Sequence, residues 1–404
     1  MSRRSMFTLK TAVLVCVVCV SAAVPILRSG GQTNSAEATW GSRDPWLRPY
    51  DANSIWNTPI GTGAEFMPTR YPEYQRGGAD PAYLIRSTLS DPIVPTHQPY
   101  AWRDRCNGAA PRTGQMRLPR DVIIPDAEQK ASGAWRTPNT NGAVLDPDGR
   151  TLRSIASACR DEVGGPLFAW TVHITDIYGD GIRGGHGASQ MSALGGSIRE
   201  GELIGDRPIA HALSLIMDAK FAYMEGVDTS TCFRWPAARC DAYAGRPGDH
   251  RYAGSNAEFR IGSLLAIPIN LSCDSLGLES SEGRKICWTM QHYGGYWTDD
   301  SAWEANYVKV EADTPDAAAF GRDEVKRDLG RVIAAAQIVR NNRPDSIGGG
   351  GTPLAPRHVN EWAPGLWGTE TTADVSQVVS PTAGTVGIHG LPPRLVDTRP
   401  AGVR

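Results

Sequence analysis

Glycine and proline are frequent throughout this chain, and they restrict it to short secondary-structure elements. Among 404 residues there are 44 Gly and 29 Pro, and 21% of the residues are charged. Both residue types interrupt helices and central strands, whereas they suit the turns between short strands. The 12 Trp and 12 Tyr add aromatic side chains that favour pleated β surfaces. We therefore expect a loop-rich, mostly-β fold.

The first 27 residues predict export from the cell. Arg3, Arg4 and Lys10 form a positive segment, followed by an apolar run over 11–27 with small residues at 21–23 for cleavage. An uncleaved anchor is the alternative, but roughly 17 apolar residues are fewer than the ~20 that a membrane span needs. We predict a secreted, extracellular protein with no stable membrane insertion after signal cleavage.

Cysteine usage agrees with export. Two cysteines lie in the signal region, and the other six form an even set, as expected for disulfides in an exported chain. Their spacings match no zinc template, so no metal site is predicted from them. Six cysteines allow fifteen pairings. Closure of short loops favours Cys232–Cys240 and Cys273–Cys287, which leaves Cys106–Cys159.

Composition divides the chain into four parts. After the signal peptide, a small and polar segment over 28–45 is expected to be a disordered lead-in. A β-rich globular domain is predicted over 46–342. Four consecutive glycines at 348–351 indicate a flexible joint within a Gly/Pro-rich linker and tail over 343–404.

Short strands are predicted where apolar residues alternate with polar ones or run between turn signals. Residues 169–178 alternate, which places Trp170 and Asp176 on one face of a strand. The segment 209–224 fits either a buried strand or a helical turn that leads into one. Further strands are expected over 121–125, 258–268 and 296–300.

The clearest helix is predicted over 315–341. Thr314 can cap it and Pro315 suits its first turn. An apolar stripe that should pack on the β core is formed by Val325, Leu329, Val332, Ile333 and Ala336. A second helix over about 280–293 is expected to end at Gly294.

Several motifs occur in an order that resembles a group of secreted bacterial proteins. They include S-I-W-N-T-P-I, I-R-G-G-H-G-A-S-Q-M-S-A-L-G-G-S-I-R-E-G-E-L, I-A-H-A-L and M-Q-H-Y-G-G-Y-W-T-D-D, within 54–341. The resemblance supplies no activity, but it implies a mostly-β body of jelly-roll or β-sandwich type, here with one packed C-terminal helix. The group does not always have a histidine at position 186. Residues that match the group's motifs are Trp56, Asn57, Arg183, Ser189, Arg199, Glu202, His211 and Asp299.

The stretch 170–213 is the densest in groups that can transfer protons or bind a polar ligand. Asp176 ends the predicted strand beside a glycine-rich loop that contains His186, and a carboxylate there can serve as general acid, base or nucleophile. A plain turn is the alternative. Asp176 and Asp180 also offer oxygen ligands for calcium, although without EF-hand spacing. No other cofactor is expected.

Two further carboxylates lie in the same stretch. If 199–202 is extended, Glu200 and Glu202 share one face, ~6.5–7 Å apart along the backbone, and like-charge repulsion would raise one pKa. Such a pair supplies an acid and a base. Alternatively, Glu202 forms a buried ion pair with Arg199 or Arg183. His211 is either a proton shuttle that faces Glu202 or a core histidine.

Tryptophan supports a hypothesis about the substrate. The chain has more Trp than a core needs, and Trp beside Asp, Glu and His is typical of a sugar-binding groove. Core packing accounts for at least half of these residues. The residues expected to bind substrate are Trp56, Trp170, Arg183, Arg199, Ser189 and Asp299.

These features predict a secreted glycan-active enzyme that cleaves glycosidic bonds of an extracellular polysaccharide. A hydrolase would take its acid and its base or nucleophile from Asp176, Glu200 and Glu202, whereas a lyase on a uronate polymer would use His186 or Tyr178 as the base. A non-catalytic cell-wall or glycan-binding surface protein is the alternative. The net charge of −2 gives no case for nucleic-acid binding.

Overall fold

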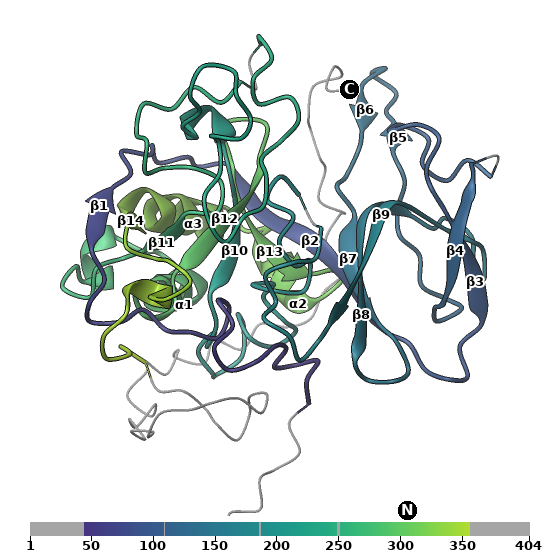
Figure 1. The fold of residues 1–404 in the computed structure, drawn as a ribbon, viewed down its shortest axis with the longest axis horizontal. Coiled ribbons are helices and arrows are strands. Elements are labelled where there is room, and N and C mark those ends of the chain that lie inside the picture. The colour runs from purple at the N-terminus through teal and green to yellow at the C-terminus, as the bar shows by residue number, and fades with distance from the viewer. Residues whose placement is uncertain (1–43, 109, 186, 249–250, 356–404) are drawn as a thin grey trace, which may run out of the picture. The chain divides into compact units, whose positions relative to one another are not determined.

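The computed structural model describes residues 44–355, apart from 109, 186, 249 and 250 (Figure 1). The predicted signal peptide, most of the predicted lead-in and the chain after 355 lie outside the described residues. Within the described ranges, no helix is both long enough and apolar enough to cross a membrane.

One sheet of twelve strands organises the fold. Its strands are β1 (Phe66–Pro68), β2 (Gly77–Arg86), β3 (Ile93–His97), β4 (Arg112–Arg117), β7 (Asn141–Leu145), β8 (Thr151–Cys159), β9 (Leu167–Asp176), β10 (Leu213–Met217), β11 (Leu264–Ala266), β12 (Gly295–Asp300), β13 (Asn306–Glu311) and β14 (Gln337–Val339). Their order in the sheet is β1-β14-β11-β12-β10-β13-β2-β7-β8-β9-β3-β4. A separate two-stranded sheet is formed by β5 (Glu128–Gln129) and β6 (Trp135–Arg136).

The sheet mixes parallel and antiparallel pairs, and β2 joins its two parts. Strand β2 pairs in parallel with β13 on one side and with β7 on the other. Strands β10 and β12 also pair in parallel, and all of their residues are buried. Strands covered on both faces must be apolar along most of their length, so the two aspartates that end β12 stand out in this setting.

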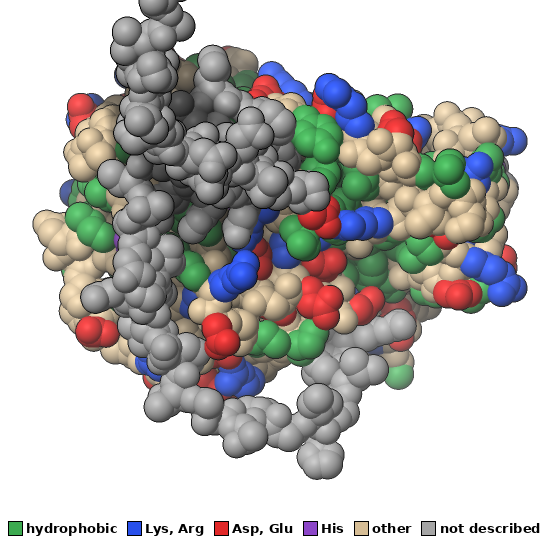
Figure 2. All heavy atoms as spheres, turned by 90° about the horizontal axis from the view of Figure 1, so that it is seen from below, with side chains coloured by type: hydrophobic (Ala, Val, Ile, Leu, Met, Phe, Trp, Pro, Cys, Tyr) green, Lys and Arg blue, Asp and Glu red, His purple; other side chains and the backbone are tan. Residues whose placement is uncertain are grey.

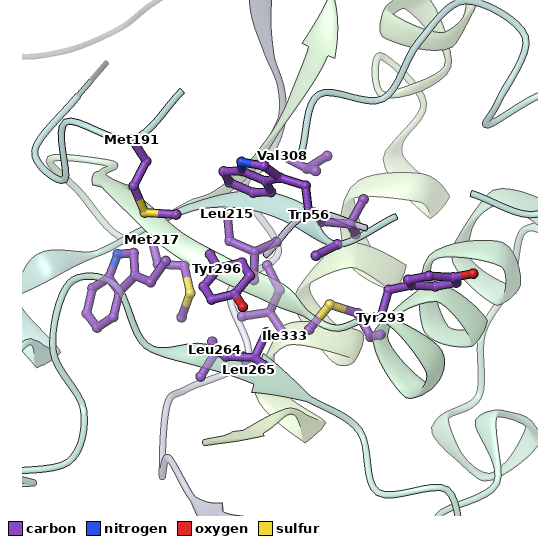
Figure 3. Packing of buried hydrophobic residues seen from close by; sticks show 14 of the residues in the cluster. Trp56, Met191, Leu215, Met217, Leu264, Leu265, Tyr293, Tyr296, Val308 and Ile333 are labelled. Carbon is purple, nitrogen blue, oxygen red and sulfur yellow. The ribbon is translucent and has the colours of Figure 1, made fainter. Parts of the chain in front are cut away.

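The main core cluster includes residues of β10, β11 and β12, among them Leu215, Leu265 and Tyr296 (Figure 3). Trp56 is 1% exposed and meets Tyr296 edge-on, with 5.5 Å between ring centroids. Its indole Nε1 donates a 2.8 Å hydrogen bond to the carbonyl oxygen of Gly181. Replacing a buried Trp with Ala costs about 3–5 kcal/mol, so Trp56 is a core residue that also anchors the loop after β9.

The C-terminal helix is confirmed, but its predicted bounds over 315–341 are wrong. The segment forms α2 (Pro315–Ala319), a break, α3 (Asp323–Ala335) and then β14. Thr314 caps α2 as predicted, because its Oγ1 accepts the backbone N–H of Ala317. The chain turns at Gly321, whose N–H bonds to the carbonyl oxygen of Ala318. The predicted apolar stripe is buried and packs α3 against α1 (Ser281–His292), β2 and β13.

The mostly-β fold class is confirmed, with one large sheet in keeping with the predicted sandwich-type body and with α3 as the packed helix. The strands predicted over 169–178 and 296–300 are β9 and β12. The one predicted over 258–268 shortens to β11, and 121–125 contains only a bridge from Ile124 to Arg160. Three short 3₁₀ helices complete the fold: η1 (Ala219–Phe221), η2 (Cys273–Leu276) and η3 (Ile347–Gly349).

All three disulfides pair as short-loop closure predicted. They join Cys106 to Cys159, Cys232 to Cys240 and Cys273 to Cys287. The predicted flexible joint at 348–351 is instead packed against the domain, because Gly61 and Gly63 donate their N–H groups to the carbonyl oxygens of Gly348 and Gly350. A side chain at Gly61 would collide with Gly350, so glycine here permits close backbone contact.

Basic and acidic side chains are interspersed on the face shown in Figure 2. Ion pairs of the described residues include Arg327–Glu279 and Arg322–Glu282.

Candidate functional site

A cavity of about 310 Å³ is lined by residues from both parts of the sheet. Its lining comes from β6, β7, β8 and β9, from the end of β12, and from two loop segments. These segments contribute Gly185, Gly187, Gln190, Arg239, Asp241 and Tyr243. This volume is at the lower end of the range typical of small-molecule sites. The cavity is open to solvent on one side, so a longer ligand can extend out of it.

Three aspartates from two distant segments meet in this cavity. Asp299 and Asp300 end β12 and are 7% and 6% exposed, and Asp241 follows the disulfide-bonded Cys240. Like charges packed this closely cannot all be ionised at little cost. The cluster must therefore retain at least one proton near neutral pH.

Asp241 is the carboxyl that retains the proton. Burial, followed by the negative charges of Asp299 and Asp300, raises the pKa of Asp241 to about 8. Tyr252 donates to Asp241 Oδ2 at 2.6 Å, which opposes this rise without reversing it. A carboxylic acid that is neutral at pH 7 is a proton donor ready for use.

Asp300 is held by a fixed set of donors. Its Oδ1 accepts the backbone N–H groups of Ala219 and Ala302, each at 2.9 Å, and its Oδ2 accepts the hydroxyl of Tyr243 at 2.8 Å. Burial nevertheless raises the pKa of Asp300. These contacts leave Asp300 oriented by the backbone and by one phenol.

Asp299 lies next to a buried cation. Its Oδ1 accepts the N–H groups of Ala188 and Asp300, at 2.8 and 3.0 Å. Lys309 on β13 is fully buried, and its Nζ has no hydrogen-bond partner among the described residues. Burial lowers the pKa of Lys309 to about 8, although the charges of Asp80 and Asp299 act in the opposite direction. Lys309 thus places a positive charge near Asp299 at neutral pH.

Aromatic and polar side chains complete the cavity. Trp102, Trp135 and Trp170 line it and are each partly exposed. Asn139 and Asn141 add amide groups from the β6–β7 connection. Indole faces combined with a few polar groups are the composition expected of a site that binds sugar rings.

Strained backbone is concentrated at the cavity. Seven non-glycine residues of the described chain have positive φ, and three of them line the cavity: Ser157 (49°), Gln190 (58°) and Ala302 (63°). Such conformations cost of order 1–3 kcal/mol each and cluster at functional sites. At Ser157 the backbone N–H bonds to Asn141 Oδ1 at 3.0 Å, within a strand that otherwise pairs with β9.

Glu202 and His211, predicted to form a proton shuttle, do meet, but in a different place. His211 Nε2 lies 3.1 Å from Glu202 Oε2, and Arg48 Nη1 lies 3.0 Å from Oε1. Burial would raise the pKa of Glu202, but His211 and Arg48 outweigh it and lower the pKa to about 2. The adjoining cavity is only about 20 Å³, which is room for about one water molecule. The arrangement is that of a buried ion pair.

The extended segment expected at 199–202 is a turn. The carboxylate of Asp316, itself fully buried, accepts the N–H groups of Gly201 and Leu203 at 2.8 and 2.6 Å and so holds the turn closed. Glu200 is exposed at its tip, so Glu200 and Glu202 are not two carboxylates on one strand face. The predicted acid–base pair of these residues is therefore not formed.

Asp176 and Asp180 each stabilise a local turn. Asp176 Oδ1 accepts the N–H of Tyr178, its Oδ2 pairs with Arg150 at 2.5 Å, and Asp180 Oδ1 accepts the N–H of Ile182. Neither residue lines the 310 Å³ cavity. Among the described residues, the group with carboxylate or sulfur atoms close enough to share a metal is Cys106, Asp126 and Cys159, and its cysteines form a disulfide.

The residues predicted to bind substrate separate into two groups. Trp170 and Asp299 line the cavity. Ser189 is buried and directly precedes the lining residue Gln190, and its backbone N–H donates a hydrogen bond to the carbonyl oxygen of Thr298. Arg183 is exposed, and Trp56 belongs to the core. Arg199 is 4% exposed and donates to Glu311 and to the carbonyl oxygen of Trp46, which leaves it no role in the cavity. His186 lies outside the described residues.

Sequence reasoning missed Asp241, Asp300 and Tyr243. Only a weak signal was available for each of them. Asp300 directly follows Asp299 at the end of a predicted strand, and Asp241 directly follows a cysteine of a short disulfide loop. Two acidic residues at the end of an apolar strand need a compensating environment, and this was the better pointer to the site.

Comparison of the chain with protein-family models, with curated proteins and with solved structures gave no match. The resemblance to secreted bacterial proteins therefore stays a prediction. Function has to be inferred from the cavity itself.

Proposed function

We propose that this protein is a secreted glycan-active enzyme that hydrolyses glycosidic bonds of an extracellular polysaccharide in the 310 Å³ cavity. The observation that carries the proposal is the convergence of Asp241, Asp299 and Asp300 on one cavity, where burial and the two neighbouring charges raise the pKa of Asp241 to about 8. An acid and an ionised carboxylate on either side of the scissile bond are what most glycoside hydrolases require. The three disulfides are compatible with an extracellular location.

In this proposal Asp241 donates its proton to the leaving glycosidic oxygen. The C–O bond to the sugar breaks as the proton arrives, and the positive charge that develops on the ring is stabilised by the neighbouring carboxylates. Tyr252 keeps the Asp241 carboxyl oriented through its 2.6 Å hydrogen bond. Water then supplies the new bond to the anomeric carbon. If Asp299 acts as base, it takes the proton of the attacking water and Asp241 regains its proton from solvent. If Asp299 acts as nucleophile, water displaces it from the sugar and Asp241 takes the proton of that water.

Asp299 is the better partner for Asp241 than Asp300. Asp299 lies near the positive charge of the buried Lys309. A nearby cation favours the anionic form of a carboxylate. We therefore assign Asp299 the role of base or nucleophile and Asp300 that of a neighbour that raises the pKa of Asp241.

The tryptophans support a sugar as the ligand. Trp102, Trp135 and Trp170 come from three separate segments, yet all contribute to this one cavity. Their rings offer apolar faces for the C–H face of a sugar, while the two asparagines offer hydrogen bonds to hydroxyl groups.

The test is to incubate the purified protein with a panel of neutral, uronate-containing and sulfated polysaccharides. New reducing ends without unsaturated products support the hydrolase. Unsaturated products would replace it with the lyase mechanism, and binding without any product would support the non-catalytic glycan-binding protein. Neither binding nor cleavage across the panel would remove the glycan hypothesis.

A further inference from the structure

The rim of the cavity carries two arginines that the proposed reaction does not use. Arg103 and Arg239 are both exposed, and both line the cavity. Neither guanidinium has a carboxylate partner or a hydrogen bond among the described residues. Other arginines of the domain are paired, for example Arg150 with Asp176 and Arg234 with Glu258.

Each of the two arginines lies close to another part of the proposed site, Arg103 in space and Arg239 in sequence. The guanidinium carbon of Arg103 lies 5.8 Å from the centre of the Trp135 ring, within the range of a cation–π contact. Arg239 directly precedes Cys240, whose disulfide closes the loop 232–240, and Asp241 directly follows it. Arg103 therefore places a positive charge beside an aromatic ring of the cavity, and Arg239 lies two residues before the proposed acid, Asp241.

The charge pattern of the cavity selects among ligands. The carboxylates Asp241, Asp299 and Asp300 lie together in the cavity and would repel an anionic group placed beside them. The guanidinium groups at the rim would attract the same group, because arginine binds carboxylates and sulfates through paired N–H donors. A neutral glycan would leave both arginines without a partner.

We infer that the substrate is an acidic glycan, whose carboxylate or sulfate groups bind Arg103 and Arg239 at the rim while a glycosidic bond lies at the aspartates. This inference rests on the proposed function, because it takes the cavity as the sugar-binding site. It names the class of glycan that the site selects.

The test measures binding separately from cleavage. An Asp241→Asn variant is titrated with oligosaccharides of a polyuronate, with the same oligosaccharides after reduction of their carboxyl groups, and with a sulfated oligosaccharide. We expect the polyuronate or the sulfated ligand to bind at least about tenfold more tightly than the carboxyl-reduced one, and this difference to shrink in high salt. Comparison of the two anionic ligands identifies which anionic group is preferred.

Variants at the rim complete the test. Arg103→Gln and Arg239→Gln, each made in the Asp241→Asn background, should weaken binding of the preferred anionic ligand about tenfold and leave the carboxyl-reduced ligand unchanged. Arg284→Gln is the matched control, because Arg284 is exposed on α1 and bonds only to the carbonyl oxygen of Leu278. Equal affinity for anionic and carboxyl-reduced ligands, or rim variants that bind like the control, would overturn the inference.

The outcomes separate this inference from the proposed function. Cleavage of glycans with no preference for acidic ones would leave the hydrolase proposal intact and remove the acidic substrate. Arginine-dependent binding of acidic glycans without cleavage would support the rim site and remove the hydrolase.

Discussion

Tyr252 donates a 2.6 Å hydrogen bond from its hydroxyl to Asp241 Oδ2, and Tyr252 is 1% exposed. Burial raises the pKa of Tyr252 well above its ordinary value, so this phenol remains a donor. The contact fixes one carboxyl oxygen of Asp241 in a place where water cannot easily replace the phenol. Proposed proton donor and orienting group thus form one buried unit.

Asp241 should make the stability of the protein depend on pH. In the folded state its pKa is about 8, whereas an ordinary aspartate has a pKa of 3.8. The folded state therefore holds a proton that the unfolded chain releases, and stability falls as pH rises from about 4 to about 8. The Asp241→Asn variant has no carboxyl at this position, so this fall in stability with rising pH is absent from it. We expect its melting temperature, relative to wild type, to rise by about 2–5 °C between pH 5 and pH 8.

Thermal melts of both proteins at several pH values provide this measurement. Asp146→Asn is a useful control, because Asp146 is ion-paired with Arg153 and does not line the cavity. A difference between Asp241→Asn and wild type that stays constant from pH 5 to pH 8 would show that Asp241 titrates normally.

Glu202 should matter for stability and not for turnover. Its pKa of about 2 is below the ordinary value of 4.5, so its ion pair contributes fully above pH 4.5 and is lost as pH falls toward 2. Glu202→Gln should lower the free energy of unfolding by about 3 kcal/mol at pH 7, because it removes the carboxylate that pairs with Arg48 and contacts His211. The deficit should disappear near pH 2.

Glu200→Gln provides the comparison for Glu202→Gln. Glu200 is exposed in the same turn, and we expect its replacement to change stability by less than about 0.5 kcal/mol. Denaturant unfolding measures both effects. If Glu202→Gln retained wild-type stability but lost turnover, the catalytic role first predicted for Glu202 would be restored.

The three tryptophans of the cavity should contribute to glycan affinity. Trp135→Ala and Trp170→Ala should each weaken binding about tenfold, because each removes a stacking surface of about 1–2 kcal/mol. Trp288→Ala is the control, since Trp288 stacks on His292 within α1 and does not line the cavity. The effect is measured by titration with the glycan that wild type binds most tightly. If Trp135→Ala and Trp170→Ala bound this glycan as tightly as the Trp288→Ala control, stacking on these rings would be ruled out.

The disulfides should separate stability from activity. In a chain-entropy estimate, loss of the Cys232–Cys240 or Cys273–Cys287 loop, with separations of 8 and 14 residues, costs about 2.5–3 kcal/mol. Asp241 directly follows Cys240, so only the first of these two loops is adjacent to it in sequence. Paired Cys→Ser variants should therefore have similar melting temperatures, whereas the Cys232/Cys240 variant should lose far more turnover than the Cys273/Cys287 variant. Equal turnover in both would contradict the positioning of Asp241 by this loop.

Local features of the fold were predictable from the sequence, because they depend on neighbouring residues. The alternation over 169–178 produces β9, Thr314 caps α2, and the shortest cysteine loops are the ones that close. The interrupted helix was less predictable, since the break at Gly321 competes with a continuous apolar stripe. The mostly-β class follows from composition alone.

The site was less predictable, because it is assembled by the order of strands in the sheet. Trp135, Asp241 and Asp299 are far apart in sequence, and nothing in their local patterns says that β12 and β9 border one cavity. Density of titratable residues was a misleading guide. The charges around Glu202 satisfy one another in a buried network, whereas the sparse aspartates of β12 lie where a ligand can reach them.

The central claim is that Asp241 donates the proton that cleaves a glycosidic bond, and turnover of the Asp241→Asn variant tests it most directly. The measurement compares product release by wild type and variant on the best substrate of the panel, together with the affinity of both for that substrate. We predict that Asp241→Asn loses at least about a hundredfold in kcat while its affinity stays within about threefold of wild type. Turnover of Asp241→Asn close to that of wild type, on a substrate that both proteins bind, would contradict the account.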